Sequence, residues 1–219
     1  LWSFSFAQGA KAAMVADDAV GVLEPDGAFT LVGLSDGKAI VQTNLEPEKT
    51  LIGIHLQRAE DRYLLITNAS APIDPSAPTR PVAGADSYPM FNGRVYAFDA
   101  QTGKSAWPTP AVVQHYGLVT NQPSRLPLLV FVVQIHRPRG PGRRDPTTSI
   151  LCIDKRTGRV AYQNEKLPQT MVGNVELSGD PARHTMTVVL PPQVIELTLS
   201  DEAVADEAPE AASQENPGT

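Results

Sequence analysis

Short runs of apolar residues, some of which alternate with polar residues, recur along most of the chain, and glycines and prolines separate them. Alternation with a period of two is typical of β-strands whose two faces differ. The 20 prolines and 16 glycines among 219 residues suit many short strands and turns better than long helices. The pattern therefore predicts an all-β chain, with strands at Lys11–Val15, Ala19–Leu23, Leu51–Gln57, Tyr63–Thr67, Val112–Leu118, Leu128–Ile135, Gly173–Leu177, Thr185–Leu190 and Gln193–Leu199.

Three further segments repeat one another. Each reads as a short strand, a tight turn that ends in glycine, and a second short strand. In two of them an aspartate, Asp99 or Asp154, follows the first strand and can hydrogen-bond the turn amides. The turn needs a residue that tolerates a positive φ, which the glycines supply, and in the first segment we expect a turn one residue shorter. The segments are Phe29–Val41, Val95–Trp107 and Ile150–Tyr162, and their glycines are Gly37, Gly103 and Gly158.

A large or branched residue, here named the anchor, stands four positions after each turn glycine and can fill the gap between adjacent sheets. The opening residues 1–6 look like the end of the same motif. The anchors are Trp2, Val41, Trp107 and Tyr162, which lie 39, 66 and 55 residues apart. Removing two predicted insert loops, 69–93 and 137–147, reduces 66 to 41 and 55 to 44. The period of about 40 residues is that of a propeller blade.

The segment Arg94–Trp107 closely resembles the PQQ-like repeat of the quinoprotein alcohol dehydrogenase-like β-propellers, in which a strand ending in Asp precedes a Thr-Gly-Lys turn and a Trp. The third segment matches except for Tyr162, and the first matches less well because Val41 replaces the Trp. This resemblance implies a propeller of four-stranded antiparallel blades, as in WD40-like folds. About four blades lie within residues 1–199, and we expect them to be part of a larger propeller.

The resemblance admits two classes of function. The first is a non-catalytic binding or scaffold module that engages a protein or other ligand through its blade loops. The alternative is a fragment of a PQQ-dependent quinoprotein dehydrogenase, which would need pyrroloquinoline quinone and calcium. Those enzymes typically place a vicinal cysteine pair against the quinone, and Cys152 is the only cysteine here. We therefore expect a binding module with no catalytic residue, no metal and no cofactor. The family resemblance alone favours a bacterial periplasm or cell envelope.

Charge is concentrated at the end of the chain. Six acids and no Lys or Arg lie in residues 201–219, so the net charge of -6 leaves residues 1–200 neutral. We therefore expect residues 200–219 to form an acidic disordered tail, and we expect no nucleic-acid partner. No apolar run approaches the roughly 18 residues needed to span a bilayer. The chain opens with Leu1 and shows no signal peptide, which we interpret as truncation or processing.

Few residues stand out as carriers of chemistry. The histidines His55, His115, His136 and His184 have no metal-ligand spacing. Two adjacent carboxylate pairs, Asp17-Asp18 and Glu60-Asp61, are expected to form turns, because neighbouring side chains point apart.

Two insertions are candidate contact loops. A local basic patch, composed of Arg137, Arg139, Arg143 and Arg144, is a candidate partner loop for an anionic partner or surface. We favour a solvated hairpin loop stiffened by Pro and Gly, because no aromatic platform accompanies the arginines. The proline-rich insert 69–93 could serve recognition or be a tolerated insertion.

Overall fold

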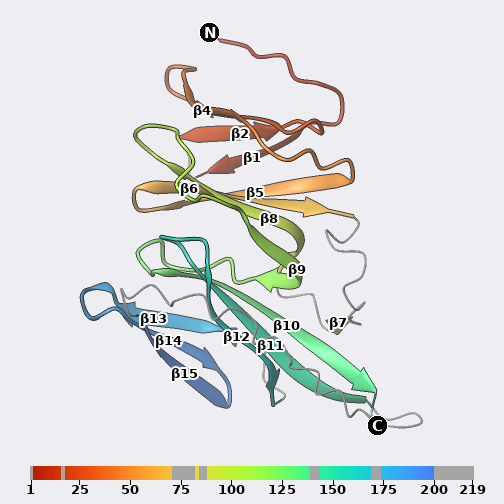
Figure 1. Cartoon of the computed structure of the whole chain (residues 1–219), viewed down its shortest axis with the longest axis vertical. Helices are drawn as coiled ribbons and strands as arrows, with labels where there is room; N and C mark the ends of the chain where they lie inside the picture. The colour runs from red at the N-terminus through yellow and green to blue at the C-terminus, as the bar shows by residue number, and fades with distance from the viewer. Residues whose placement is uncertain are drawn as a thin grey trace, which may run out of the picture.

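The computed structural model describes residues 2–15, 18–70, 82–83, 88–138, 144–168 and 174–199, of which 82–83, 135–138, 144–146 and 181 are described by their backbone alone. Within these ranges the chain forms three antiparallel sheets arranged one after another along the long axis of the molecule (Figure 1). This is an all-β, propeller-like fold, as the sequence pattern predicts. No helix in the described part of the chain is long and apolar enough to cross a membrane.

The first sheet is a regular four-stranded meander. Consecutive strands pair in the order β1-β2-β3-β4, which is the arrangement expected of a single blade. Phe29, Leu31 and Val41 lie in its core with exposures of 1% or less, because alternate residues of each strand face the second sheet. The strands are β1 (Lys11–Val15), β2 (Ala19–Leu23), β3 (Ala28–Gly33) and β4 (Ala39–Asn44).

The second sheet joins two of the expected blades into one. Its eight strands run in the order β12-β11-β10-β9-β8-β6-β5, with β7 on β10. Val95–Asp99 of β8 pair with β6, whereas Met90–Val95 pair with β9, and Leu118 of β9 pairs with Phe131 of β10. The strands are β5 (Leu51–Ala59), β6 (Arg62–Ala69), β7 (Val82–Ala83), β8 (Met90–Asp99), β9 (Ala111–Leu118), β10 (Leu128–Pro138), β11 (Arg144–Asp154) and β12 (Val160–Leu167).

Both predicted insert loops contain strand residues. β8 already begins at Met90, and the short β7 within the first insert pairs with β10. In the second insert β10 and β11 continue their ladder as far as Pro138 opposite Arg144, so only residues 139–143 of it lie outside the description. Backbone pairing across a long hairpin overrides the unfavourable local composition of this Pro-, Gly- and Arg-rich stretch.

The third sheet has three strands and lies at the opposite end of the molecule from the first (Figure 1). A short 3-10 turn, η3 (Pro181–Arg183), connects its first two strands. Met186, Val188 and Leu190 face the second sheet and are fully buried. The strands are β13 (Glu176–Asp180), β14 (Thr185–Leu190) and β15 (Gln193–Thr198), so β13 ends three residues later than predicted. The predicted acidic tail, 200–219, lies outside the described residues.

The three repeat turns have the same backbone geometry. In each turn the glycine N–H donates to the carbonyl four residues earlier, at 2.8–2.9 Å, and the glycine φ is 67–76°. The expectation of a shorter first turn is therefore wrong. Gly33 takes the place of the aspartate there, and Asp36 Oδ1 instead accepts from the Lys38 N–H at 3.0 Å.

Each turn glycine lies beneath the anchor of the preceding repeat. A methyl group on Gly158 would come within 2.6 Å of the Trp107 ring, and one on Gly37 within 2.5 Å of the Trp2 ring. Trp107 is 4% exposed, whereas Trp2, which belongs to no strand of the described chain, is 41% exposed. Gly103 packs against the backbone of Ile40 and Val41. The last anchor, Tyr162, packs against the apolar cluster of the third sheet.

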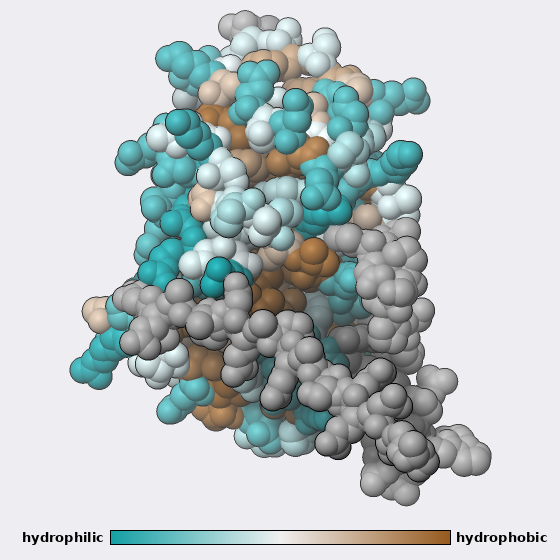
Figure 2. Space-filling model, in the orientation of Figure 1, coloured by the Kyte–Doolittle hydropathy of each residue, from teal (hydrophilic) through white to brown (hydrophobic). Residues whose placement is uncertain are grey.

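Polar and apolar surface is distributed as this architecture requires. Figure 2 shows hydrophilic residues along both margins of the upper part of the molecule and hydrophobic residues between them. Strands run from margin to margin in the same part of Figure 1, so the margins carry the turns. The turns therefore present polar side chains, and the apolar residues fill the space between sheets.

Candidate binding pocket

A pocket of about 330 Å³ opens where connections of the second sheet meet the ends of the third sheet. It lies at the turn end of the sheets, the end that carries the repeat turns. The β5–β6 turn, the β9–β10 connection, the β11–β12 turn and the ends of the third sheet all contribute to its wall. The lining residues are Ala59, Glu60, Asp61, Arg62, Ser124, Arg125, Leu126, Pro127, Asp154, Lys155, Arg156, His184 and Leu199.

Backbone hydrogen bonds hold these connections together. The second residue of each repeat turn donates its N–H to a neighbouring hairpin or connection: Ala100 to the Asp61 carbonyl and Lys155 to the Pro127 carbonyl, both at 2.8 Å. In the third sheet the Leu199 N–H donates to the His184 carbonyl at 2.8 Å. Main-chain contacts therefore help to fix the walls of the pocket.

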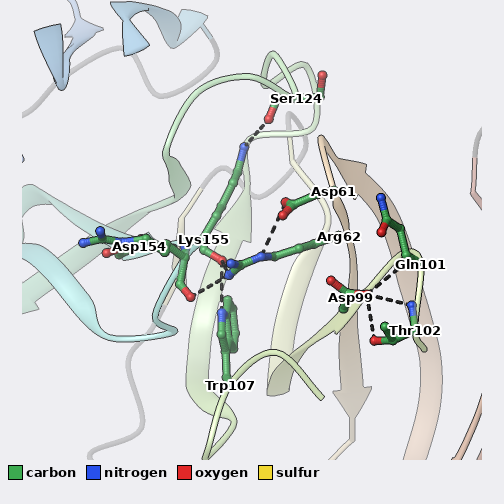
Figure 3. A network of polar contacts seen from close by, with 10 residues as sticks. Asp61, Arg62, Asp99, Gln101, Thr102, Trp107, Ser124, Asp154 and Lys155 are labelled. Carbon is green, nitrogen blue, oxygen red and sulfur yellow. Dashed lines mark hydrogen bonds and ion pairs between the residues drawn. The ribbon is translucent and has the colours of Figure 1, made fainter. Parts of the chain in front are cut away.

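Lys155 is the most unusual side chain in the pocket. It is 6% exposed, and its Nζ lies 3.5 Å from the Pro123 carbonyl and 3.4 Å from the Ser124 carbonyl (Figure 3). Burial disfavours the charged amine and lowers its pKa to about 8, against the opposing influence of the Glu60 carboxylate. Lys155 is therefore a buried ammonium at neutral pH, held only by long contacts to carbonyl oxygens.

Two side chains fix the backbone of Lys155. The Arg62 Nη1 donates to the carbonyls of Lys155, at 3.0 Å, and Arg156, at 2.5 Å, and the Trp107 Nε1 donates to the Lys155 carbonyl at 3.0 Å. Arg62 also forms an ion pair with Asp61 at 3.5 Å. Figure 3 shows Arg62 and Trp107 converging on this turn. The direction in which Lys155 leaves the backbone is thus set by the anchor of the preceding repeat.

The two repeat aspartates contact their own turns. Asp99 Oδ1 accepts from the Thr102 Oγ1 at 2.7 Å, the Thr102 N–H at 2.7 Å and the Gln101 N–H at 3.1 Å (Figure 3). These hydrogen bonds, those from Thr102 above all, lower the pKa of Asp99 below its ordinary value. Asp154 Oδ1 accepts from the Arg156 N–H at 2.6 Å. Both carboxylates close turns.

The histidines are dispersed. His55 is half-buried beside the Phe91 ring, with ring centroids 6.0 Å apart, and burial lowers its pKa. His115 is in β9 with a φ of 56°, and its Nε2 is buried without a hydrogen-bond partner. His184 is at the pocket, and the side chain of His136 lies outside the described residues.

Three residues of the two carboxylate pairs, Asp18, Glu60 and Asp61, are described, and all three lie in turns. Glu60 and Asp61 form the β5–β6 turn, where Glu60 has a φ of 51°. Asp18 forms an ion pair with Arg58 at 3.4 Å, and Asp17 lies outside the described residues.

The predicted partner loop is not near the pocket. Arg137 and Arg144 belong to the far end of the β10–β11 hairpin, whereas Asp154 at its near end lines the pocket. Ten residue steps of strand separate the two ends by roughly 33 Å. Arg139 and Arg143, and the side chains of the other two arginines, lie outside the described residues. The described backbone of Arg137 and Arg144 therefore lies away from the pocket.

Potential metal ligands and the single cysteine are dispersed in the described part of the chain. No group of three or more His, Cys, Asp or Glu side chains within them could hold a metal ion. Cys152 is fully buried in β11, and burial raises the pKa of its thiol to about 12.

Sequence reasoning missed Lys155, although the repeat carries a signal. Lys155 is the second residue of its turn, and the other two repeats place Leu34 and Ala100 at this position. All three donate their N–H to a neighbouring connection, so the turn itself has no need of a charged side chain. The signal is only that a lysine stands where the other two repeats have an apolar or a small residue.

No protein-family model and no curated protein sequence matches the chain. Among solved structures, it is similar to the computationally designed Ika4 protein at 12% identity and a TM-score of 0.38, over 90% of this chain and 96% of that one. It is also similar to the quinohemoprotein alcohol dehydrogenase ADHIIG from Pseudomonas putida HK5, at 12% identity and a TM-score of 0.37, over 80% of this chain and 31% of the enzyme. A third is BamB from Moraxella catarrhalis, at 13% identity and a TM-score of 0.22, over 86% of this chain and 63% of BamB. The chain thus spans about a third of the dehydrogenase it matches.

Proposed function

We propose that this chain is a non-catalytic binding module that engages a protein partner through the turn end of its sheets, with the Lys155 pocket at the centre of the contact. The observation that supports this proposal is the pocket itself. Its walls come from connections of the second and third sheets and are held by main-chain hydrogen bonds. Binding sites commonly lie on loops that a rigid scaffold positions. The scaffold is supplied by three apolar clusters, of which two join adjacent sheets and one is formed by the second sheet and Trp107.

The residues around the pocket suit recognition of a polar surface. Arg125 is exposed at the rim, and Arg62, which is ordered by three contacts, lies in the wall. Rim charges of this kind steer association and select partners, while a buried group at the centre contributes most of the affinity.

The test is site-specific crosslinking. A photoreactive amino acid is placed at Arg125, at the pocket, or at Asp26, in the β2–β3 turn at the other end of the first sheet. In extracts of the source organism, a defined crosslinked species should form from position 125, should be absent from position 26, and should be lost when Arg62→Ala is introduced. Equal crosslinking from both positions, or none from either, would refute the proposal.

A further inference from the structure

The Lys155 ammonium has no close hydrogen-bond acceptor and no counter-ion within the described part of the chain. A charged N–H donor ordinarily sits 2.7–2.9 Å from its acceptor, whereas the two acceptors of this ammonium are carbonyls at 3.4 and 3.5 Å. No carboxylate of the described residues forms an ion pair with it within 4.0 Å. A buried cation without a counter-ion is costly, and a bound anion at this position would remove that cost.

The volume and the charge of the pocket allow an anion from solution to bind there as that counter-ion. Its volume of about 330 Å³ accommodates a carboxylate or phosphate group beside the Lys155 side chain. Arg125 and Arg156 add positive charge to the wall. Of the acids, Asp61 is paired with Arg62, and Asp154 accepts from a backbone N–H. Glu60 is the remaining acid, and it is exposed.

We propose that the pocket is an oxyanion-binding site in which the Lys155 ammonium is the principal ligand, and that it receives a carboxylate or phosphate group. The inference deepens the proposed function, since an acidic group of the protein partner is one source of such an oxyanion and a free phosphate is another. The lysine is available for this role because the turn requires only its backbone. Leu34 and Ala100 make the same main-chain bond without a charged side chain.

The first measurement is titration of the purified chain at pH 7 and constant ionic strength, followed by NMR and calorimetry. The probes are inorganic phosphate, acetate and N-acetyl-glutamate amide, with N-acetyl-glutamine amide as the uncharged match. We expect saturable binding of at least one oxyanion, with shifts at the amides of residues 124–127 and 155, and none of the glutamine compound. Lys155→Met should weaken binding at least tenfold, whereas Lys104→Met, an exposed lysine of the preceding repeat turn, should leave it unchanged.

Glu60 provides the sharper test. In an oxyanion site it is a like-charge neighbour of the ligand, so Glu60→Gln should tighten binding severalfold. Unchanged affinity in Lys155→Met, or weaker affinity in Glu60→Gln, would overturn the inference.

Failure of the inference is distinguishable from failure of the proposed function. Probe binding needs no partner. No crosslinking from position 125 with oxyanion binding intact would therefore contradict the protein partner and support a site for a small anion. Crosslinking with no oxyanion binding would support the binding module and contradict the oxyanion site. Preference for the glutamate compound over phosphate would identify an acidic side chain as the source, and the reverse preference would identify a free phosphate.

Discussion

The contact between Trp107 and Gly158 should be measurable as a strong coupling between the two positions. Trp107 is 4% exposed and donates from its Nε1 to the Lys155 carbonyl. Replacing a buried tryptophan by alanine costs about 3–5 kcal/mol. Trp107→Val, which gives this repeat the anchor that Val41 provides in the first, should cost somewhat less, about 2–4 kcal/mol of unfolding free energy.

Gly158→Ala adds two penalties of different origin. The φ of 76° places the residue in the left-handed region, which costs about 1–2 kcal/mol for a residue with a Cβ. The new methyl would also lie 2.6 Å from the indole, which must shift, and such overpacking costs about 1–3 kcal/mol. Only the first penalty remains once the indole is removed. Gly158→Ala should therefore cost about 1–3 kcal/mol less in the Trp107→Val background than in the parent chain.

The assay is urea unfolding followed by circular dichroism, which does not depend on the tryptophan that is removed. Gly103→Ala is the matched control, because its φ is 67° and its methyl would meet the Ile40 carbonyl, a backbone atom far from Trp107 in the chain. The cost of Gly103→Ala should be the same with and without Trp107. Equal costs of Gly158→Ala in both backgrounds would show that the indole does not pack on this turn.

Three other predictions follow from burial and close contacts. The pKa of Lys155 is about 8 in the folded chain and 10.5 ordinarily, so the buried charge destabilises the fold fully below pH 8 and no longer above about pH 10.5. The urea unfolding free energy of Lys155→Met should therefore exceed that of the parent chain by on the order of 3 kcal/mol at pH 7. This difference should close by pH 10.5. Cys152 should resist thiol reagents at pH 8 until the chain unfolds, because burial raises its pKa to about 12; rapid labelling of the native chain would contradict this. Gly93→Ala should cost at least about 2 kcal/mol, because its methyl would meet the Thr67 carbonyl across the β6–β8 pair, whereas Gly53→Ala, with open space around it, should be neutral or stabilising in the same unfolding assay.

Local sequence determined the strands and the turns. The short apolar run Ala19–Leu23 and the partly alternating segment Thr185–Leu190 sufficed to locate β2 and β14 at their observed bounds. The glycine in each repeat turn needs only its own backbone conformation, so Gly103 and Gly158 mark turns whatever surrounds them. These features depend on residues a few positions apart, which is the range over which periodicity and turn chemistry act.

The tertiary structure decided how strands combine and where a site forms. β8 pairs with β6 along one half and β9 along the other, a choice that depends on distant partners and merges two predicted blades. The pocket gathers residues from 59–62, 124–127, 154–156, 184 and 199, whose spacing in the chain follows no motif. Lys155 reads as an ordinary turn lysine in the sequence. Its burial and low pKa exist only because the chain around Ser124 covers it and Trp107 and Arg62 hold its backbone in place.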